Sequence, residues 1–238
     1  MNQIRVLFVG WLVMVSVVGS SAWGHFVWIE VDQQEGKILA RSSFGEHGSW
    51  DPDYADRVKT TAYQIRSAKV AEEAISLAWD PAHEWLSAEK EFTAAGAISG
   101  KCVWGLFGKS ADNESLLTFY PKAMFGPASD WKEVGPSPAA ALEMIPSATA
   151  EGIAIIVLAE GKPLADAKLK LYAPGATSSQ PATTDSAGRF VWKITEPGRY
   201  AIAVVHRTKA SGTYEGKTYQ GQMQAATLTF AYPASAGK

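Results

Sequence analysis

The clearest strand signal in this chain is PGRYAIAVVHR, residues 197–207. A proline and a glycine open the segment, a continuous run YAIAVV follows, and polar residues return at His206. β-branched and aromatic side chains favour strands, and the run is too short for an amphipathic helix. The segment therefore predicts a β-strand that ends at a histidine.

Similar strand signals lie on both sides of this run. The sequence GKPLADA at 161–167 and the sequence DSAGRF at 185–190 place Gly, Pro and Asp where chain reversals need positive or fixed φ. Alternating apolar residues surround these turns, and AATLTFAY follows at 225–232. We therefore expect a small antiparallel β-sandwich domain at 150–233, followed by a tail at 234–238.

The first half of the chain has the same pattern, and a proline-rich segment follows it. Four prolines in residues 126–149 oppose regular hydrogen bonding there, which predicts a linker between two domains. An N-terminal β domain is expected at 25–125, so the fold class is all-β with two β-sandwich-like domains. Its predicted strands are 26–31, 37–44, 60–67, 74–79, 101–107 and 116–124.

Residues 1–24 have the pattern of a secretory signal peptide. Arg5 provides a positive charge, residues 6–19 are apolar, and small residues follow. The apolar run is short for a membrane span, although an uncleaved anchor is an alternative. We expect a periplasmic or secreted protein with no stable membrane span after cleavage. The net charge of −2 and the absence of Lys/Arg runs argue against a nucleic-acid partner.

The only cysteine, Cys102, excludes an intramolecular disulfide. In GKCVWGLFG this cysteine alternates with apolar neighbours, which predicts a buried thiol instead of a reactive one or a soft metal ligand.

His25 lies where the predicted leader meets the first strand. Cleavage after Gly24 makes His25 the first residue, whose α-amine and imidazole chelate a metal; with a second imidazole they form a histidine brace suited to copper. Cleavage after Ala22 gives Trp-Gly-His, whose amine, two amides and imidazole can surround square-planar Cu(II) or Ni(II). Both starts predict a copper or nickel site, whereas an ordinary histidine at a strand start is the alternative.

Three other side chains are candidate metal ligands. His206 ends its strand before a Gly-containing loop, and His47 lies beside Glu46 in another Gly-bounded loop, where a solvated histidine is the alternative. The fourth histidine, His83, is expected to face solvent, and the Asp51 region is expected to form a turn started by aspartate. Zincin, redox, hydrolase and nucleotide-binding motifs are missing from the sequence.

Several short segments resemble, in order, a bacterial family linked to periplasmic nickel and cobalt uptake, the NikM/NikK-like group. The resemblance implies an exported β-rich protein with an immunoglobulin- or transthyretin-like C-terminal module and a role in divalent metal handling. It places His25, His206 and Glu46 on the family's matching positions, whereas His47 has no fixed counterpart. The segments are HFVWIE (25–30), FGE (44–46), LTFYPKAM (117–124), LEMIP (142–146), GKPLADAKL (161–169), TDSAGRF (184–190), GRYAIAVVH (198–206) and AATLTF (225–230).

The leading hypothesis is a non-enzymatic protein that binds copper or nickel at His25, with His206 as second ligand, and supplies an envelope transporter or receptor. A structural or adhesion protein is the alternative, because nine tryptophans could bind a protein or glycan partner without metal. A copper brace oxidase acting on polysaccharide is a third hypothesis.

Overall fold

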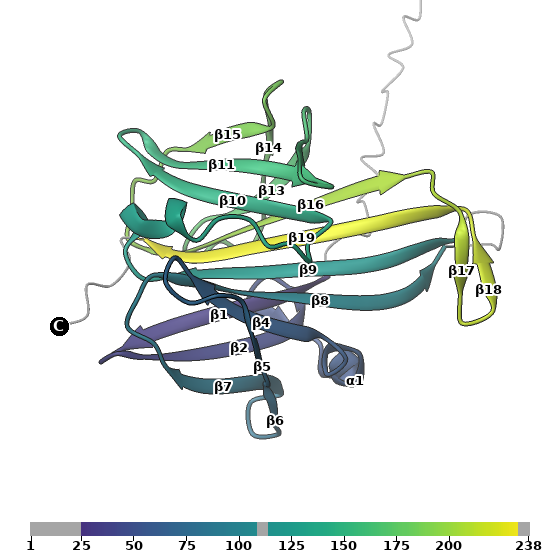
Figure 1. Cartoon of the computed structure of the whole chain (residues 1–238), viewed down its shortest axis with the longest axis horizontal. Coiled ribbons are helices and arrows are strands. Elements are labelled where there is room, and N and C mark those ends of the chain that lie inside the picture. The colour runs from purple at the N-terminus through teal and green to yellow at the C-terminus, as the bar shows by residue number, and fades with distance from the viewer. Residues whose placement is uncertain (1–24, 109–113, 233–238) are drawn as a thin grey trace, which may run out of the picture.

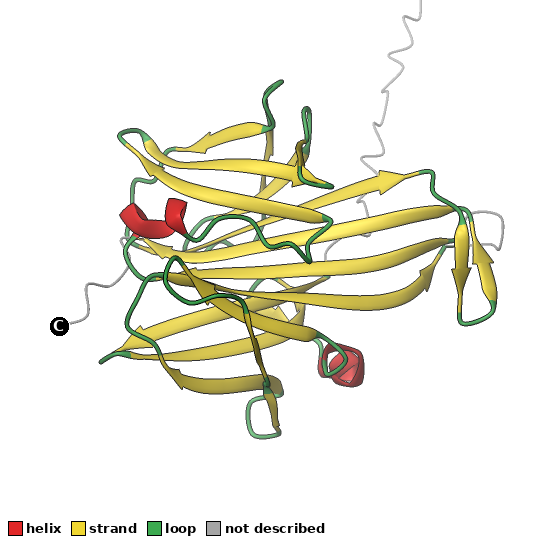
Figure 2. Ribbon diagram, in the orientation of Figure 1, coloured by secondary structure: helices red, strands yellow, loops and turns green. Residues whose placement is uncertain are grey.

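The structure, a computed structural model, describes residues 25–108 and 114–232, so the predicted signal peptide and tail lie outside the described residues. Strands dominate, which confirms the all-β prediction (Figure 2). None of the helices in this described part is long and apolar enough to cross a membrane. These helices are η1 (Pro52–Tyr54), α1 (Ala55–Val58) and η3 (Ala128–Glu133).

An eight-stranded central sheet forms the middle layer of the molecule (Figure 1). Its strands are β4 (Ala62–Ser67), β5 (Glu73–Ile75), β8 (Gly96–Phe107), β9 (Ser115–Phe125), β13 (Lys168–Tyr172), β14 (Gln180–Thr183), β16 (Gly198–Thr208) and β19 (Gly221–Tyr232). Their order across the sheet is β14-β13-β16-β19-β9-β8-β4-β5.

Two smaller sheets cover the two faces of the central sheet (Figure 1). The β1 sheet contains β1 (Phe26–Gln34), β2 (Lys37–Glu46), β3 (Ser49–Trp50), β6 (Ala78–Asp80) and β7 (Trp85–Glu91). The β10 sheet contains β10 (Leu142–Thr149), β11 (Gly152–Ala159), β12 (Lys162–Pro163) and β15 (Arg189–Trp192). A separate hairpin of β17 (Gly212–Tyr214) and β18 (Lys217–Tyr219) projects from one end.

Each face of the central sheet has its own hydrophobic core, and the run YAIAVV contributes to both. Because side chains alternate along a strand, Ala201 and Ala203 face the core beneath the β1 sheet. Ile202 and Val204 face the core beneath the β10 sheet. All four are at most 1% exposed, so this run is apolar throughout because it lies between two cores.

The two expected domains share one sheet, which corrects the predicted division of the chain. Strand β9, from the first half, pairs in parallel with β19, from the second, and Phe119 lies opposite Ala225. The expected linker at 126–149 contains η3 and the paired strand β10, in which Pro146 lies opposite Ile155. Because β10 is an edge strand, its proline nitrogen can face away from the ladder.

Two strand predictions need local corrections. Residues 74–79 were expected to form one strand, but β5 and β6 lie in different sheets and are separated by Ser76 and Leu77. Strand β7 was missed because its sequence, WLSAEKE, lacks a regular apolar–polar alternation and ends in three consecutive charged residues. The immunoglobulin or transthyretin likeness stays a prediction.

Side chains of β19 hold the outer edge of β1 against the central sheet. Thr227 donates its hydroxyl hydrogen to the carbonyl oxygen of Val27 at 2.8 Å, and Thr229 does the same to Ile29. The indole of Trp28 donates to the carbonyl of Gly45 at 3.0 Å. These bonds fix β1, and therefore the position of His25 at its start.

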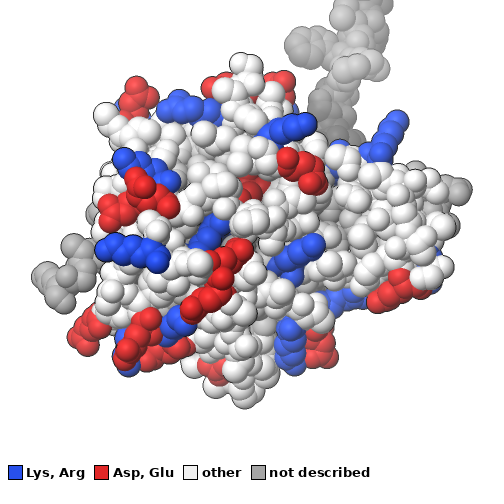
Figure 3. Space-filling model, viewed as in Figure 1, with Lys and Arg blue, Asp and Glu red and all other residues white. Residues whose placement is uncertain are grey.

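Charged side chains of both signs are interspersed on the face shown in Figure 3. Lys and Arg side chains do not form a continuous stripe on this face.

Candidate functional site

An aromatic pocket of about 180 Å³ lies between the β1 sheet and the central sheet, with His25 in its lining. Its walls come from parts of the chain that are far apart in sequence but meet where β1 packs on β9 and β19. The other lining residues are Phe26, Phe44, Tyr54, Trp104, Phe107, Leu117, Phe119, Val205, Met223 and Ala225.

The aromatic rings of this pocket pack against one another. Phe44 stacks on Trp104 with ring centroids 4.3 Å apart, and Trp104 meets Phe119 edge-on at 5.2 Å. A β-bulge between Val103 and Gly105 interrupts the regular register of β8 at Trp104. Arg57 holds this bulge by donating to the Trp104 carbonyl.

Partly exposed aromatic side chains form the rim of the pocket. Tyr54 is 41% exposed and Phe107 is 45% exposed, values high for such large apolar side chains. Tyr54 belongs to η1, whose first turn is capped by the Asp51 carboxylate accepting from the Asp53 amide. This confirms the predicted turn that aspartate begins. The arrangement resembles other ligand sites, which are mostly apolar with few polar groups.

His25 is exposed and immediately precedes β1, so the predicted start of the first strand is correct. Its imidazole lies edge-on to Phe44, with ring centroids 5.6 Å apart. Within residues 25–108 and 114–232 it makes no hydrogen bond or ion pair. The imidazole nitrogens are therefore free to bind a ligand.

His206 projects from the opposite face of the central sheet. Its neighbour Val205 lines the aromatic pocket, so alternation directs His206 toward the β10 sheet. Its cross-strand partner Gln224 donates to Glu160, which follows β11. The structure does not bring His25 and His206 together, which corrects the predicted brace between them.

His47 occupies a separate and largely buried position. Its ring lies between Trp28 and Tyr172, with centroid distances of 5.1 and 5.2 Å. Its Nε2 is 3.8 Å from a Glu30 oxygen, too far for a hydrogen bond, and is buried without a hydrogen-bond partner among the described residues. Burial, with a smaller effect of Arg199, lowers the pKa of His47 and favours the neutral ring. His47 does not line the aromatic pocket.

The remaining candidate residues do not complete a metal site. Glu46 is exposed at the end of β2, opposite Ser49. His83 is exposed, as predicted, and contacts Asp80 at 2.7 Å. Cys102 is buried, as predicted, and burial raises the pKa of its thiol. Nowhere in the described ranges do three or more His, Cys, Asp or Glu side chains form a group that could hold a metal ion.

The sequence interpretation missed the pocket itself. Trp104, Phe119 and Met223 were apparent only as apolar residues within predicted strands, and Phe44 as the end of one. Their convergence depends on the packing of β1 over β9 and β19, which no local pattern encodes.

No protein-family profile matches the chain, and no curated protein sequence is significantly similar to it. The resemblance to the NikM/NikK-like group therefore stays an expectation.

Proposed function

We propose that this is an exported protein that binds Cu(II) or Ni(II) at its mature amino terminus, through residues 23–25. The observation that carries the proposal is the position of His25: it is exposed, next to β1, and its ring has no polar partner among the described residues. An imidazole in this state can accept a metal without first breaking a contact.

The Trp-Gly-His start is favoured over a start at His25. A brace needs a second imidazole, and the nearest candidate by sequence argument, His206, lies on the other face of the central sheet. A chain that begins at Trp23 supplies four nitrogens from consecutive residues: its amine, two amides and the His25 imidazole. These donors suit the square-planar preference of Cu(II) and Ni(II) and need no other part of the fold.

The pH dependence of such a site follows from its donors. The α-amine and the imidazole bind metal only in their unprotonated forms, and each of the two amide nitrogens must release its proton as well. Metal affinity should therefore fall steeply as the pH is lowered from about 7 to 5. Release to an envelope transporter or receptor completes the proposal, and the NikM/NikK-like resemblance supports that step.

The test begins with the intact mass of the exported protein, which we expect to correspond to a first residue of Trp23. Copper and nickel titrations, followed by absorption spectroscopy, should then show one strong site per chain. H25A should abolish it, and one residue added before Trp23 should do the same, since it moves the imidazole out of the chelate. H206A and H47F are matched controls that should bind normally. A mature start beyond His25, or equal loss in H206A, would overturn the proposal.

The pocket lining favours a second function, the binding of a small aromatic molecule. An apolar cavity of about 150 Å³ can hold benzene, and this pocket of about 180 Å³ is lined largely by Phe44, Trp104, Phe119 and other apolar side chains. Phenol should bind saturably to the wild type in a calorimetric titration. L117W, which fills the pocket, should remove phenol binding, whereas unchanged phenol binding in L117W would exclude the pocket.

A further inference from the structure

A cluster of three charged side chains is buried between the central sheet and the β10 sheet. Lys122 of β9 donates to a Glu143 oxygen of β10 at 2.7 Å, and Arg66 of β4 donates to the same oxygen at 3.0 Å. All three are at most 5% exposed. Lys122 also donates to the carbonyl of Met144 at 3.3 Å.

The charges of this cluster do not balance. One carboxylate, Glu143, faces two cations, and its second oxygen is already engaged by the Ser137 amide at 2.8 Å. The Nε of Arg66 is buried and has no hydrogen-bond partner among the described residues. A buried charge without compensation is costly, so the cluster leaves one positive charge for an anion to neutralise.

A small, partly open cavity of about 100 Å³ adjoins the cluster, and both Lys122 and Glu143 line it. Gln64, Ser99 and Tyr120 of the central sheet contribute polar side chains to its lining. The loop before β10 and the start of β10 cover the cavity with mostly apolar side chains, namely Ala139, Ala140, Leu142 and Met144. The Lys122–Glu143 ion pair thus forms one part of the lining, and much of the remaining wall is apolar.

We propose that this cavity binds a short-chain monocarboxylate, with its carboxylate on Lys122 and its alkyl group against the alanine and leucine side chains. A cavity of about 150 Å³ holds the six carbons of benzene, so 100 Å³ has room for about four non-hydrogen atoms, the size of acetate. A single negative charge matches the excess of the cluster, whereas a phosphate dianion exceeds it. The apolar wall favours an alkyl group over chloride.

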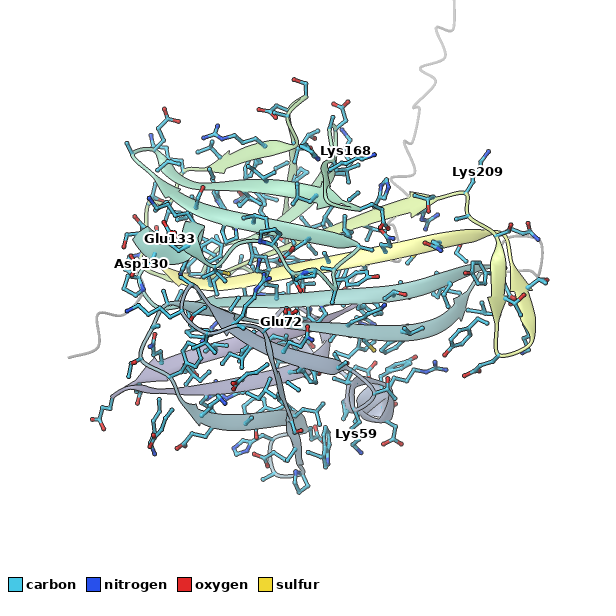
Figure 4. The ribbon with its side chains drawn as sticks, viewed as in Figure 1. Lys59, Glu72, Asp130, Glu133, Lys168 and Lys209 are labelled. Atoms are coloured by element: carbon cyan, nitrogen blue, oxygen red, sulfur yellow. The ribbon has the colours of Figure 1, made fainter. Side chains whose placement is uncertain are left out.

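Other charged groups surround this cavity and set its pH dependence. Glu143 forms ion pairs with both Lys122 and Arg66. The exposed Lys101 also lines the cavity. Glu72, labelled in Figure 4, accepts a hydrogen bond from the Ser137 hydroxyl at 2.9 Å. Burial, and then Arg66, lowers the pKa of Lys122 to about 8, against the opposing effect of Glu143. Since an anion binds the ammonium form, carboxylate affinity should fall as the pH rises above 8.

The experiment is a calorimetric titration of the full exported chain with sodium acetate at pH 7, at constant ionic strength, in acetate-free buffer. The wild type should show saturable one-site binding. K122M should bind at least about tenfold more weakly, since a charge-assisted hydrogen bond is lost. The control K101M, which removes an exposed lysine at the same cavity, should change the affinity less than about threefold.

A second variant distinguishes a binding site from a cluster that only stabilises the fold, because loss of a structural contact would not strengthen acetate binding. E143Q removes the competing carboxylate, so E143Q should bind acetate more tightly than the wild type. Where K122M does not fold, wild-type titrations at pH 7 and 9.5 replace it, and acetate affinity should be lower at 9.5. No saturable acetate binding by the wild type, unchanged binding in folded K122M, or chloride bound as tightly as acetate would overturn the proposal. Metal binding at His25 is unaffected by any of these outcomes.

Discussion

Thr227 donates a 2.8 Å hydrogen bond to the carbonyl oxygen of Val27, which lies 200 residues earlier in the chain. Among the described strands, β1 has a neighbour on one side only, because it ends the order of its sheet. The carbonyl oxygens on this edge of β1 accept hydrogen bonds from hydroxyl groups of β19 and not from a neighbouring strand. Thr229 donates in the same way to the carbonyl oxygen of Ile29. The amino-terminal strand is thereby fixed to the last strand of the fold.

We predict that T227V lowers the free energy of unfolding by about 1–3 kcal/mol, because the isosteric change leaves the buried Val27 carbonyl without its donor. Urea denaturation monitored by tryptophan fluorescence measures this change. T218V, on the exposed strand β18, is the matched control and should stay within about 0.5 kcal/mol of the wild type. Equal stability of both variants would show that the Thr227 bond does not stabilise the fold.

We predict that the stability of the fold increases at alkaline pH because Lys122 is buried. Its folded pKa of about 8 lies below the ordinary value of 10.5. Between these values the unfolded chain keeps a proton that the folded chain has released, so the free energy of unfolding rises with pH, by up to about 3 kcal/mol. Above pH 10 Tyr63 acts in the opposite sense, since burial raises its pKa to about 12.

The measurement is urea denaturation at pH 7.5, 8.5 and 9.5 in acetate-free buffer. K122M should show a smaller increase across this range than the wild type. The same increase in both proteins would assign the pH dependence to other groups.

We predict that the burial of His47 makes the stability of the fold sensitive to acid. The folded pKa of this histidine is lowered by burial and Arg199, so below about pH 6.5 the unfolded chain binds a proton that the folded chain resists. Stability should therefore fall between pH 6.5 and 5.5, and H47F should reduce this fall. Thermal unfolding at both pH values checks the prediction, with H83F, at an exposed position, as the control.

Gly45 should tolerate substitution poorly. Its φ is +152°, and a Cβ there would lie 2.0 Å from the Ser49 carbonyl oxygen, which is backbone and cannot move aside. Gly161 also has positive φ, at +72°, but a Cβ there meets nothing within 4 Å. G161A should cost about 1–2 kcal/mol of stability, the conformational penalty alone, and G45A at least about twice as much. Similar losses in urea denaturation would contradict the clash.

Residues 150–238 should not fold alone, although their sequence predicts a separate sandwich. Strand β19 would lose its partner β9, and Met223 and Ala225 would lose the core that they share with the first half. We expect this fragment to show no cooperative urea transition, measured by Trp192 fluorescence. A sigmoidal transition would instead support two independent domains.

Local sequence predicted most strands but not their arrangement. The run at 200–205 was predicted as a strand because its side chains are aromatic, β-branched or small. Its sequence alone could not show that a separate hydrophobic core lies on each of its two faces. The position of His25 at a strand start was correct for the same local reason. The side from which His206 projects depends on which face of β16 meets β1, and therefore on pairings between distant strands.

The pairing of β9 with β19 also sets an order of events during folding. Strand β9 ends at Phe125, and its partner begins at Gly221, so the central sheet stays incomplete until almost the whole chain has emerged from the ribosome. Contacts so distant in sequence form slowly, and an unpaired central strand is prone to associate with other chains. A chain whose central sheet is still incomplete would suit the export that we propose, because a secretory channel threads unfolded polypeptides across the membrane.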